Sequence, residues 1–222
     1  MTRVKICGIT DVAHAQAAAE AGTDLIGVVF APSPRRVTPE KAKEIAAAAK
    51  EHGLPVVGVF VNTPAAEVNS LAADCGLDWV QLSGDEDTDC CRQVRRPLIK
   101  AVHIAPDWDE EQLLAHLESS QRELRHHPPI YLLDTQVEEK YGGTGKAFPW
   151  DIARPAAEKY PVIIAGGLDP ENVGRVVTEL KPWGVDVSSG VESGGTKDIE
   201  KIKAFVAAVR RAKAMLYRAK GG

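Results

Sequence analysis

Short apolar segments with the pattern of strands alternate with helix-like segments from one end of this chain to the other, eight times over. The strand-like segments, such as VKICGI, DLIGVVF and PVVGVFV, are runs of Val, Ile and Leu, typical of strands buried on both faces of a parallel sheet. The helix-like segments carry capping signals, as where Thr38 and Pro39 open one helix and Gly53 closes it. This alternation predicts a parallel sheet with its helices outside.

Eight βα units in 222 residues fit a closed (β/α)8 TIM barrel, a fold that routinely forms a single α/β domain of this length. The alternative is an open doubly wound sheet. Its usual fingerprint, GxGxxG after the first strand, is absent because KICGIT contains a single glycine. No linker or low-complexity segment interrupts the series, so we expect one barrel domain spanning residues 1–222.

The composition argues against several classes of protein. A formal net charge of −4 does not favour a general nucleic-acid surface, which would need a basic stripe. No stretch approaches the roughly 20 consecutive apolar residues of a membrane span, and the first residues lack a signal-peptide pattern, so we expect a cytoplasmic protein. The four cysteines, Cys7, Cys75, Cys90 and Cys91, fit no zinc template and are expected to be free thiols.

Function in a barrel lies at the carboxyl ends of the strands, and this rule selects the candidate site residues. Cys7 ends the first strand, just before Gly8, and is therefore expected to face the rim, although free cysteine also packs as a small apolar residue. The other strand-end candidates are the segment from Phe30 onward, Asn62, Ser83, His103, Asp134, Gly166, Gly167, Ser188 and Ser189.

Two neighbouring strand ends carry the residues of a phosphate site. IIAGGLDPENV places paired glycines after the seventh strand, and VDVSSGVE places Ser-Ser-Gly after the eighth. Phosphate sites in barrels frequently use these two loops, where glycines let backbone N–H groups approach the phosphate and serine hydroxyls add donors. A glycine pair alone could simply turn a strand into its helix, but two such loops side by side predict phosphate binding.

Cys7 and Asp134 end the first and sixth strands, on different sides of the barrel mouth. A thiolate and a carboxylic acid placed in this way make a base and acid pair. Asp134 could instead be a turn or capping residue. The segment after it, TQVEEKYGGTGKAF, is long and glycine-rich, which is typical of a lid or binding loop rather than a tight turn.

Basic residues near the mouth are candidates for binding anions. Arg35 and Arg36 follow the second strand, and an arginine there can hold a carboxylate through two hydrogen bonds. Lys5 alternates with its apolar neighbours and should point into the barrel, where it needs an ion-pair partner such as Asp134 or Asp186.

The motifs KICGIT, the SPR loop, GVFVN, VQLSG, LLDT, YGGTGKAFPW, AGGLDPENV and VDVSSGVE occur in this order along the chain. Over its whole length the sequence resembles phosphoribosylanthranilate isomerase of tryptophan biosynthesis. The resemblance implies a barrel that converts N-(5-phosphoribosyl)anthranilate to 1-(2-carboxyphenylamino)-1-deoxyribulose 5-phosphate by an Amadori rearrangement. It implies that Asp134 is the general acid that opens the furanose ring, and that Cys7 is the general base that removes the C2 proton.

The resemblance also implies where this substrate binds. Arg35, in preference to Arg36, should hold the anthranilate carboxylate. The substrate-binding residues are expected to be Arg35, Gly166, Gly167, Asp186, Ser188, Ser189 and Gly190. The family uses neither a metal nor an organic cofactor, so none is expected here. The expected partner is the phosphorylated sugar-anthranilate substrate, with no nucleic acid and no membrane, and the chain is expected to be a monomer or a homodimer.

Two positions depart from the family pattern. Ser83 stands where the family usually has a histidine, in QLSG instead of QLHG, and Arg36 stands where an aromatic residue usually follows the SPR loop. Two other functions remain alternatives. A related sugar-phosphate isomerase of histidine biosynthesis would need a second phosphate site and a pair of aspartates, and a non-catalytic barrel serving as a binding module would not need Cys7 or Asp134.

Overall fold

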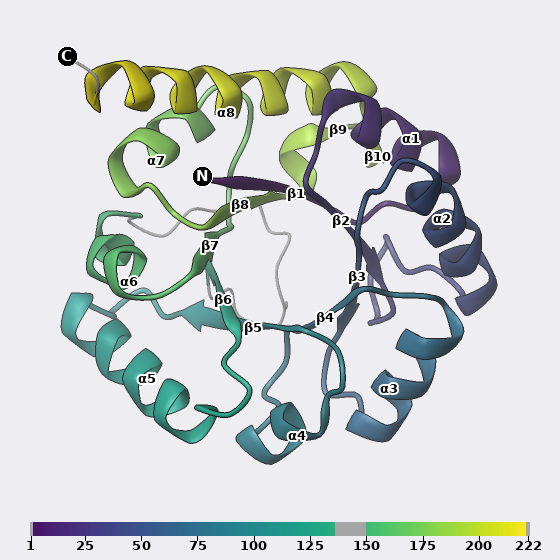
Figure 1. Cartoon of the computed structure of the whole chain (residues 1–222), viewed down its shortest axis with the longest axis horizontal. Coiled ribbons are helices and arrows are strands. Elements are labelled where there is room, and N and C mark those ends of the chain that lie inside the picture. The colour runs from purple at the N-terminus through teal and green to yellow at the C-terminus, as the bar shows by residue number, and fades with distance from the viewer. Residues whose placement is uncertain (1, 136–149, 221–222) are drawn as a thin grey trace.

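The computed structural model describes residues 2–135 and 150–220, in which eight parallel strands close into a barrel surrounded by helices (Figure 1). Neighbours in the sheet follow chain order, and the first strand pairs with the last. The strands are β1 (Arg3–Cys7), β2 (Leu25–Val29), β3 (Val56–Phe60), β4 (Trp79–Leu82), β5 (Leu98–Ile104), β6 (Ile130–Thr135), β7 (Val162–Ile164) and β8 (Gly184–Val187). The predicted TIM barrel is confirmed, and the open sheet is excluded because the sheet closes.

A helix follows each strand and packs on the outside of the barrel (Figure 1). The α-helices are α1 (Val12–Ala21), α2 (Pro39–Glu51), α3 (Ala65–Asp74), α4 (Thr88–Gln93), α5 (Glu110–Glu123), α6 (Arg154–Lys159), α7 (Val173–Leu180) and α8 (Ile199–Lys220). Two short 3-10 helices are η1 (Trp150–Ala153) and η2 (Ser189–Val191). Among the described helices, none is long and apolar enough to cross a membrane.

The apolar core has two layers, because successive side chains of a strand point to opposite faces. On β6, Tyr131 and Leu133 belong to the layer between sheet and helices, whereas Ile130 and Leu132 belong to a separate cluster inside the barrel. The inner cluster consists of Leu25, Val57, Ile99, Ala101, Ile130, Leu132, Ile163 and Ala165. This cluster fills the barrel interior, so functional residues must gather at its carboxyl end.

The start of α2 follows the prediction, since Thr38 is the N-cap and its hydroxyl accepts a hydrogen bond from the Lys41 N–H. The Thr-Pro pair before α3 does not repeat this arrangement. There Pro64 is the N-cap, and the Thr63 hydroxyl donates to the carbonyl of Val61 instead. The same dipeptide therefore opens two helices by different contacts.

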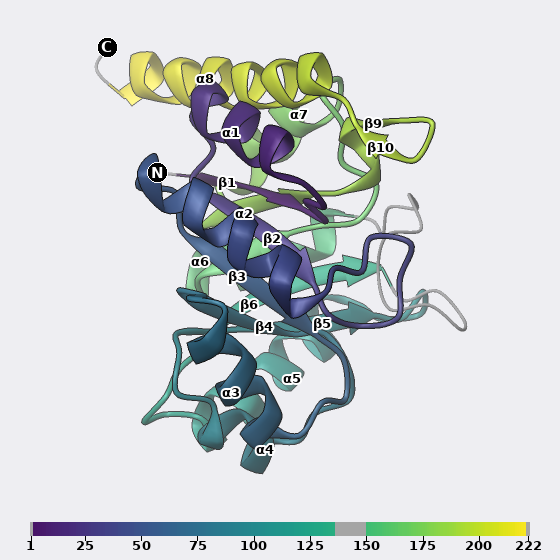
Figure 2. The same cartoon turned by 90° about the vertical axis from the view of Figure 1, so that its right-hand side faces the viewer.

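A two-stranded hairpin, β9 (Glu192–Ser193) and β10 (Thr196–Lys197), lies between β8 and α8 and was not predicted. Its turn is Gly194–Gly195, with both residues at positive φ, a conformation that favours glycine. Figure 2 shows the hairpin projecting from the same end of the barrel as the loop between β2 and α2. The hairpin therefore stands beside the rim that is expected to hold the site.

Candidate active site

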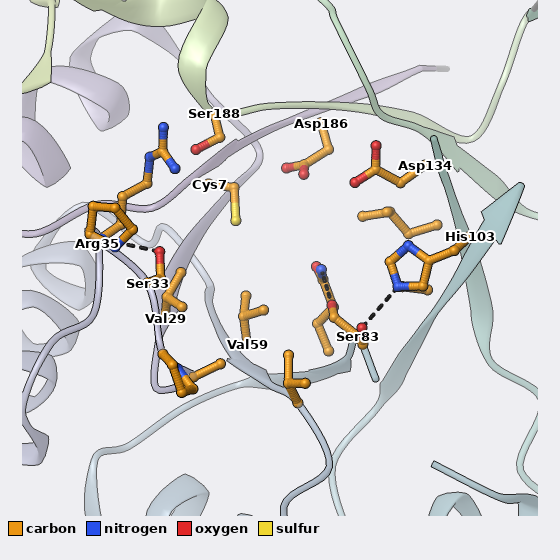
Figure 3. Close-up of a pocket in the computed structure, with 17 residues that line it drawn as sticks. Cys7, Val29, Ser33, Arg35, Val59, Ser83, His103, Asp134, Asp186 and Ser188 are labelled. Carbon is orange, nitrogen blue, oxygen red and sulfur yellow. Dashed lines mark hydrogen bonds between the residues drawn. The ribbon is translucent and has the colours of Figure 1, made fainter. Parts of the chain in front are cut away.

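A cavity of about 670 Å³ opens at the carboxyl ends of the strands (Figure 3). This volume lies within the range of about 300–1,000 Å³ found for small-molecule sites. Its polar lining residues are Cys7, Ser33, Arg35, Gln81, Ser83, His103, Asp134, Asp186 and Ser188. The cavity therefore gathers side chains from strands that are far apart in the sequence, as the strand-end rule predicts.

A second cavity, of about 40 Å³, adjoins the first at the ends of β7 and β8. Asp134, Asp186 and Ser188 line both cavities. The small cavity is otherwise lined by Ala165, Gly166, Gly167, Leu168, Val187, Ser189 and Gly190. The five glycines and serines predicted to bind phosphate thus meet around one space.

Backbone geometry explains the glycine at position 190. A Cβ atom there would lie 1.9 Å from the carbonyl oxygen of Leu168, so the loops after β7 and β8 approach too closely for any side chain. Asn172 supports the other loop, since its amide donates to the carbonyl of Gly167 at 2.8 Å. The small cavity is therefore shaped by backbone that two separate loops hold in place.

Cys7 ends β1 and is buried against β2 while its side chain lines the larger cavity. A Cβ atom at Gly27 would lie 2.9 Å from its Sγ and 3.2 Å from Lys5 Nζ, so thiol and ammonium pack on the same glycine. Burial raises the pKa of the Cys7 thiol above its ordinary value, although the cations of Lys5 and Lys197 act to lower it. The two cations therefore act in the direction that favours a thiolate, but desolvation outweighs them.

Lys5 is fully buried, and its Nζ lies 2.9 Å from Oδ1 of Asp186 on the adjacent strand β8. Burial by itself lowers the pKa of Lys5, but the charges of Asp186 and Cys7 outweigh burial and raise it. Lys5 is therefore a cation inside the barrel. Of the two partners that the sequence left open, the structure gives Asp186.

Asp134 is the last residue but one of β6 and faces the same cavity as Cys7, with Asp186 between them (Figure 3). It does not cap the following helix, because Ala153 is the residue before α6. The glycine-rich segment predicted as a lid, together with most of the YGGTGKAFPW motif, lies in residues 136–149, outside the described residues.

Ser83 and His103 contact each other on the wall between β4 and β5. His103 Nε2 lies 2.9 Å from the carbonyl oxygen of Ser83, and since a carbonyl only accepts, this nitrogen carries a hydrogen (Figure 3). The Ser83 hydroxyl accepts from the Gln81 amide at 2.9 Å. A histidine thus reaches the wall from β5, beside the position where the sequence has serine.

Two strand-end candidates lie elsewhere. Phe30 stacks on Phe60 with ring centroids 5.0 Å apart, and Asn62 accepts a hydrogen bond from the N–H of Asp85. Neither residue lines either of the two cavities. Phe30 and Asn62 themselves are therefore wrong as rim candidates, because their side chains point away from the barrel axis. The segment that continues from Phe30 does line the larger cavity, through residues 31–35.

Arg35 lines the cavity, whereas Arg36 is exposed and does not. Arg35 Nε and Nη2 each lie 2.7 Å from a carboxylate oxygen of Glu192 on the hairpin. Lys197 Nζ, also on the hairpin, lies 2.6 Å from Glu192 Oε1. Glu192 and Lys197 were missed in the sequence, where VESGGTKD has the composition of an ordinary loop.

Position 8 must be glycine because the Arg35 side chain passes directly beside its backbone. Its φ is +77°, and a Cβ atom there would lie 2.5 Å from Arg35 Cδ and 3.1 Å from Ser188 Oγ. In this structure the Arg35 side chain occupies the space beside Gly8. Within the described residues, no group of three or more His, Cys, Asp or Glu side chains is placed to hold a metal ion.

Comparison with known proteins agrees with this geometry. Residues 4–208 match the family model of N-(5'-phosphoribosyl)anthranilate (PRA) isomerase. The isomerase of that name from Dehalococcoides mccartyi is 46% identical over 214 residues, which cover 96% of this chain and 97% of the relative. The crystal structure of phosphoribosyl anthranilate isomerase from Thermotoga maritima has a TM-score of 0.82 at 36% identity, covering 95% of this chain and all of that one.

A further crystal structure holds an isomerase of the same name in complex with reduced 1-(o-carboxyphenylamino)-1-deoxyribulose 5-phosphate. It is 35% identical, has a TM-score of 0.79, and covers 95% of this chain and all of that chain. Family match, sequence identity and shared barrel agree over nearly the whole length. The chain belongs to the N-(5'-phosphoribosyl)anthranilate isomerase family.

Proposed function

We propose that Cys7 and Asp134 are the base and the acid with which this chain carries out its family's reaction. The chain is an aldose-ketose isomerase (EC 5.3.1.24) that converts N-(5-phosphoribosyl)anthranilate to 1-(2-carboxyphenylamino)-1-deoxyribulose 5-phosphate in tryptophan biosynthesis. The observation that carries the assignment is a thiol from β1 and a carboxyl group from β6 that line one cavity, next to a glycine-serine subcavity.

In the first step, Asp134 donates its proton to the furanose ring oxygen, the C1–O bond breaks, and the anthranilate nitrogen forms a Schiff base with C1. In the second step, Cys7 accepts the proton from C2, and the electron pair moves to give an enolamine. The enolamine then tautomerises to the ketone. One residue of each type suffices, which is consistent with a site containing one thiol and a facing carboxyl group.

Cys7 must lose its proton before it can act as a base. Burial opposes this loss by raising the pKa of the thiol, and the two buried cations Lys5 and Lys197 favour the thiolate. Lys5 is thus assigned the role of stabilising the thiolate from inside the barrel. Asp186 keeps Lys5 charged and in place through their 2.9 Å contact.

The substrate fits the cavity by its chemistry. We assign the phosphate to the small cavity of Gly166, Gly167, Ser188, Ser189 and Gly190, where N–H groups and hydroxyls converge. The aromatic ring is assigned to the apolar wall on β2 and β3, and its carboxylate to Arg35. Asp186 lies between the two cavities, where it can contact the sugar.

The described residues that line the two cavities come from a single chain, which supports a site that works in a monomer and equally in each half of a homodimer. We also propose that the barrel acts as one catalytic domain over the whole chain and works in the cytoplasm. The closed sheet that joins the first strand to the last supports the first point. The four free cysteines support the second, because they suit a reducing compartment.

The test is turnover by the purified chain, followed by the change in anthranilate fluorescence. We expect conversion of N-(5-phosphoribosyl)anthranilate and at least a hundredfold lower kcat/KM for the corresponding substrate of the histidine-pathway isomerase. Turnover of the histidine-pathway substrate alone would transfer the assignment to that enzyme. Binding of the anthranilate substrate without turnover would indicate the non-catalytic barrel.

A further inference from the structure

The β9–β10 hairpin carries two charged side chains that are buried beside the proposed site, and their contacts with Arg35 and with each other have no part in the reaction steps above. The side chain of Glu192 is 7% exposed and that of Lys197 is 1% exposed. Buried charges of this kind are costly unless they are paired and hydrogen-bonded. Their contacts therefore indicate what the hairpin does.

Glu192 holds one edge of the Arg35 guanidinium. Its two carboxylate oxygens accept from Nε and Nη2, at 2.7 Å each. A guanidinium has five N–H donors, so this contact leaves both hydrogens of Nη1 and one of Nη2 unengaged by Glu192. Those hydrogens form the second edge of the fork, which has the geometry for a two-point contact with another carboxylate.

Lys197 links Glu192 to the proposed phosphate loop. Its ammonium donates to Glu192 Oε1 at 2.6 Å, to the Ser188 carbonyl at 2.9 Å and to the Ser188 hydroxyl at 3.2 Å. These three contacts account for all three of its hydrogens. Ser188 lines both cavities, so one continuous set of contacts runs from the phosphate loop to Arg35.

The charges of this set leave one positive charge in excess. Arg35 and Lys197 are cations and Glu192 is the anion between them, so the three together carry a net charge of +1. Without Lys197, Arg35 and Glu192 would form a neutral pair with little attraction for a second carboxylate. With it, Arg35 is held by a carboxylate and still attracts another.

We propose that Glu192 and Lys197 are positioning residues that fix Arg35 for the carboxylate on the substrate's ring, and that they set the preference for a carboxylated ring. The proposal rests on the proposed function, in which Arg35 binds that carboxylate. Gly8 completes the arrangement, because it leaves room for the Arg35 methylenes beside Ser188. An arginine whose guanidinium is already fixed loses little freedom when the ligand binds, which favours affinity.

The experiment compares two inhibitors shaped like the reduced product, one with the ring carboxylate and one without it. In the wild type, the carboxylated inhibitor should bind more tightly. Glu192→Gln should reduce this preference about tenfold, on the scale of the charge-assisted hydrogen bond to Arg35 that it loses. The set then carries more positive charge, so a reduced preference would come from the loss of the fixed guanidinium position and not from charge. Binding of the inhibitor without the carboxylate should stay within about twofold, and KM should rise about tenfold while kcat changes less than about threefold.

A matched control is Glu200→Gln, since Glu200 is an exposed glutamate at the start of α8, paired with Lys203. It makes the same charge change near the site and should leave the preference unchanged. A double-mutant cycle adds the second control. In an Arg35→Ala background, Glu192→Gln should have almost no further effect on the preference, because the residue it positions is gone.

Lys197→Met should also reduce the preference, because the set then loses its net positive charge. If this variant fails to fold, Glu192→Gln and the double-mutant cycle still decide. An unchanged or increased preference in folded Glu192→Gln overturns the proposal. Failure of the proposed function gives a different result, since the wild type would then bind neither inhibitor or show no preference to lose.

Discussion

The two halves of the cavity wall follow opposite rules of construction (Figure 3). The half formed by β1, β6 and β8 presents Cys7, Asp134 and Asp186, with the buried cation Lys5 behind them. The half formed by β2 and β3 with their loops is mainly apolar and includes Val29, Ala31, Pro32, Pro34, Val59 and Val61. The reactive half needs partners for every buried charge, whereas the apolar half only needs shape.

This difference indicates that one half of the wall serves proton transfer and the other half serves binding of the aromatic ring. Proton transfer requires groups that are held in place and tuned by neighbours, and the reactive half supplies them from strands rather than from flexible loops. A flat aromatic ring requires a dry surface, and the apolar half supplies it. Substitutions in the first half should therefore act mainly on kcat, and those in the second mainly on KM.

The largest effect is expected for the two proposed proton-transfer groups. Cys7→Ala and Asp134→Asn should each lower kcat by about 10²–10⁴-fold with the fold intact, because each removes the only group in its role. Steady-state kinetics measured by anthranilate fluorescence, with circular dichroism for folding, test this. Val59→Ala is the control from the apolar half and should raise KM by at most about tenfold, for the loss of two carbon atoms of packing.

Retention of more than a tenth of wild-type kcat in either Cys7→Ala or Asp134→Asn would contradict the assignment. A comparable loss of kcat in Val59→Ala would remove the contrast between the two halves.

The next effect concerns Arg35, at the boundary where the apolar half meets the hairpin. Arg35→Ala should raise KM about 10- to 100-fold, on the scale of hydrogen bonds to a charged group. Arg36→Ala is the matched control, since Arg36 is exposed and does not line the cavity. Michaelis constants of both variants decide the matter, and the reverse ranking would move the carboxylate contact to Arg36.

The pH dependence of activity should respond to substitutions in the reactive half of the cavity wall and not to those in the apolar half. Lys5 favours the Cys7 thiolate, so Lys5→Met should raise the pKa of that thiol further. A base acts only above its pKa, so the acidic limb of the kcat/KM profile should move to higher pH, and activity near neutral pH should fall. Ultraviolet absorbance of the thiolate, corrected with Cys7→Ser, reports the same ionisation directly.

Asp186→Asn has the opposite sign, because the charge of Asp186 raises the pKa of Cys7. In this variant the acidic limb of the kcat/KM profile should move to lower pH. The test therefore stays decisive if Lys5→Met is unstable. Shifts in the same direction for both variants would show that the pair acts through structure rather than through charge.

The smallest effect is expected for Ser83, on the wall between the two halves. The acid and base roles are filled elsewhere, and His103 already reaches this wall through the Ser83 carbonyl. Ser83→His should therefore change kcat/KM by less than about tenfold, or roughly 1.4 kcal/mol of transition-state stabilisation. A hundredfold gain, or a new ionisation near the histidine reference of about 6.5 in kcat, would show that a histidine here takes part in catalysis.

The sequence predicted the barrel well because each strand and helix carried its own local signals. It also predicted that Lys5 points inward, since alternation along a strand is local. The choice between Asp134 and Asp186 as its partner depended on which strands become neighbours, and closure of the barrel decides that. The sign of the pKa shift of Cys7 depended on burial, which no local pattern measures.

The sequence contained a signal that could have excluded Phe30 and Asn62 as rim residues. Inward-facing side chains recur with a period of two, so Val29 and Val59 facing inward imply that Phe30 and Phe60 face outward, and the same parity excludes Asn62. The sequence also contained a signal for the missed β9–β10 hairpin, because Gly-Gly between two short segments is a known hairpin turn. Its function was not readable, since the contact between Glu192 and Arg35 joins residues 157 positions apart.

The pairing of β1 with β8 has a consequence for how the protein is made. Lys5 leaves the ribosome early, but its counter-ion Asp186 lies 181 positions later in the chain. Until β8 arrives, a partly synthesised barrel has two open edges and would have to bury an uncompensated ammonium group, so the incomplete barrel is penalised. The ion pair that sustains the proposed base therefore also selects against a fold that closes too soon.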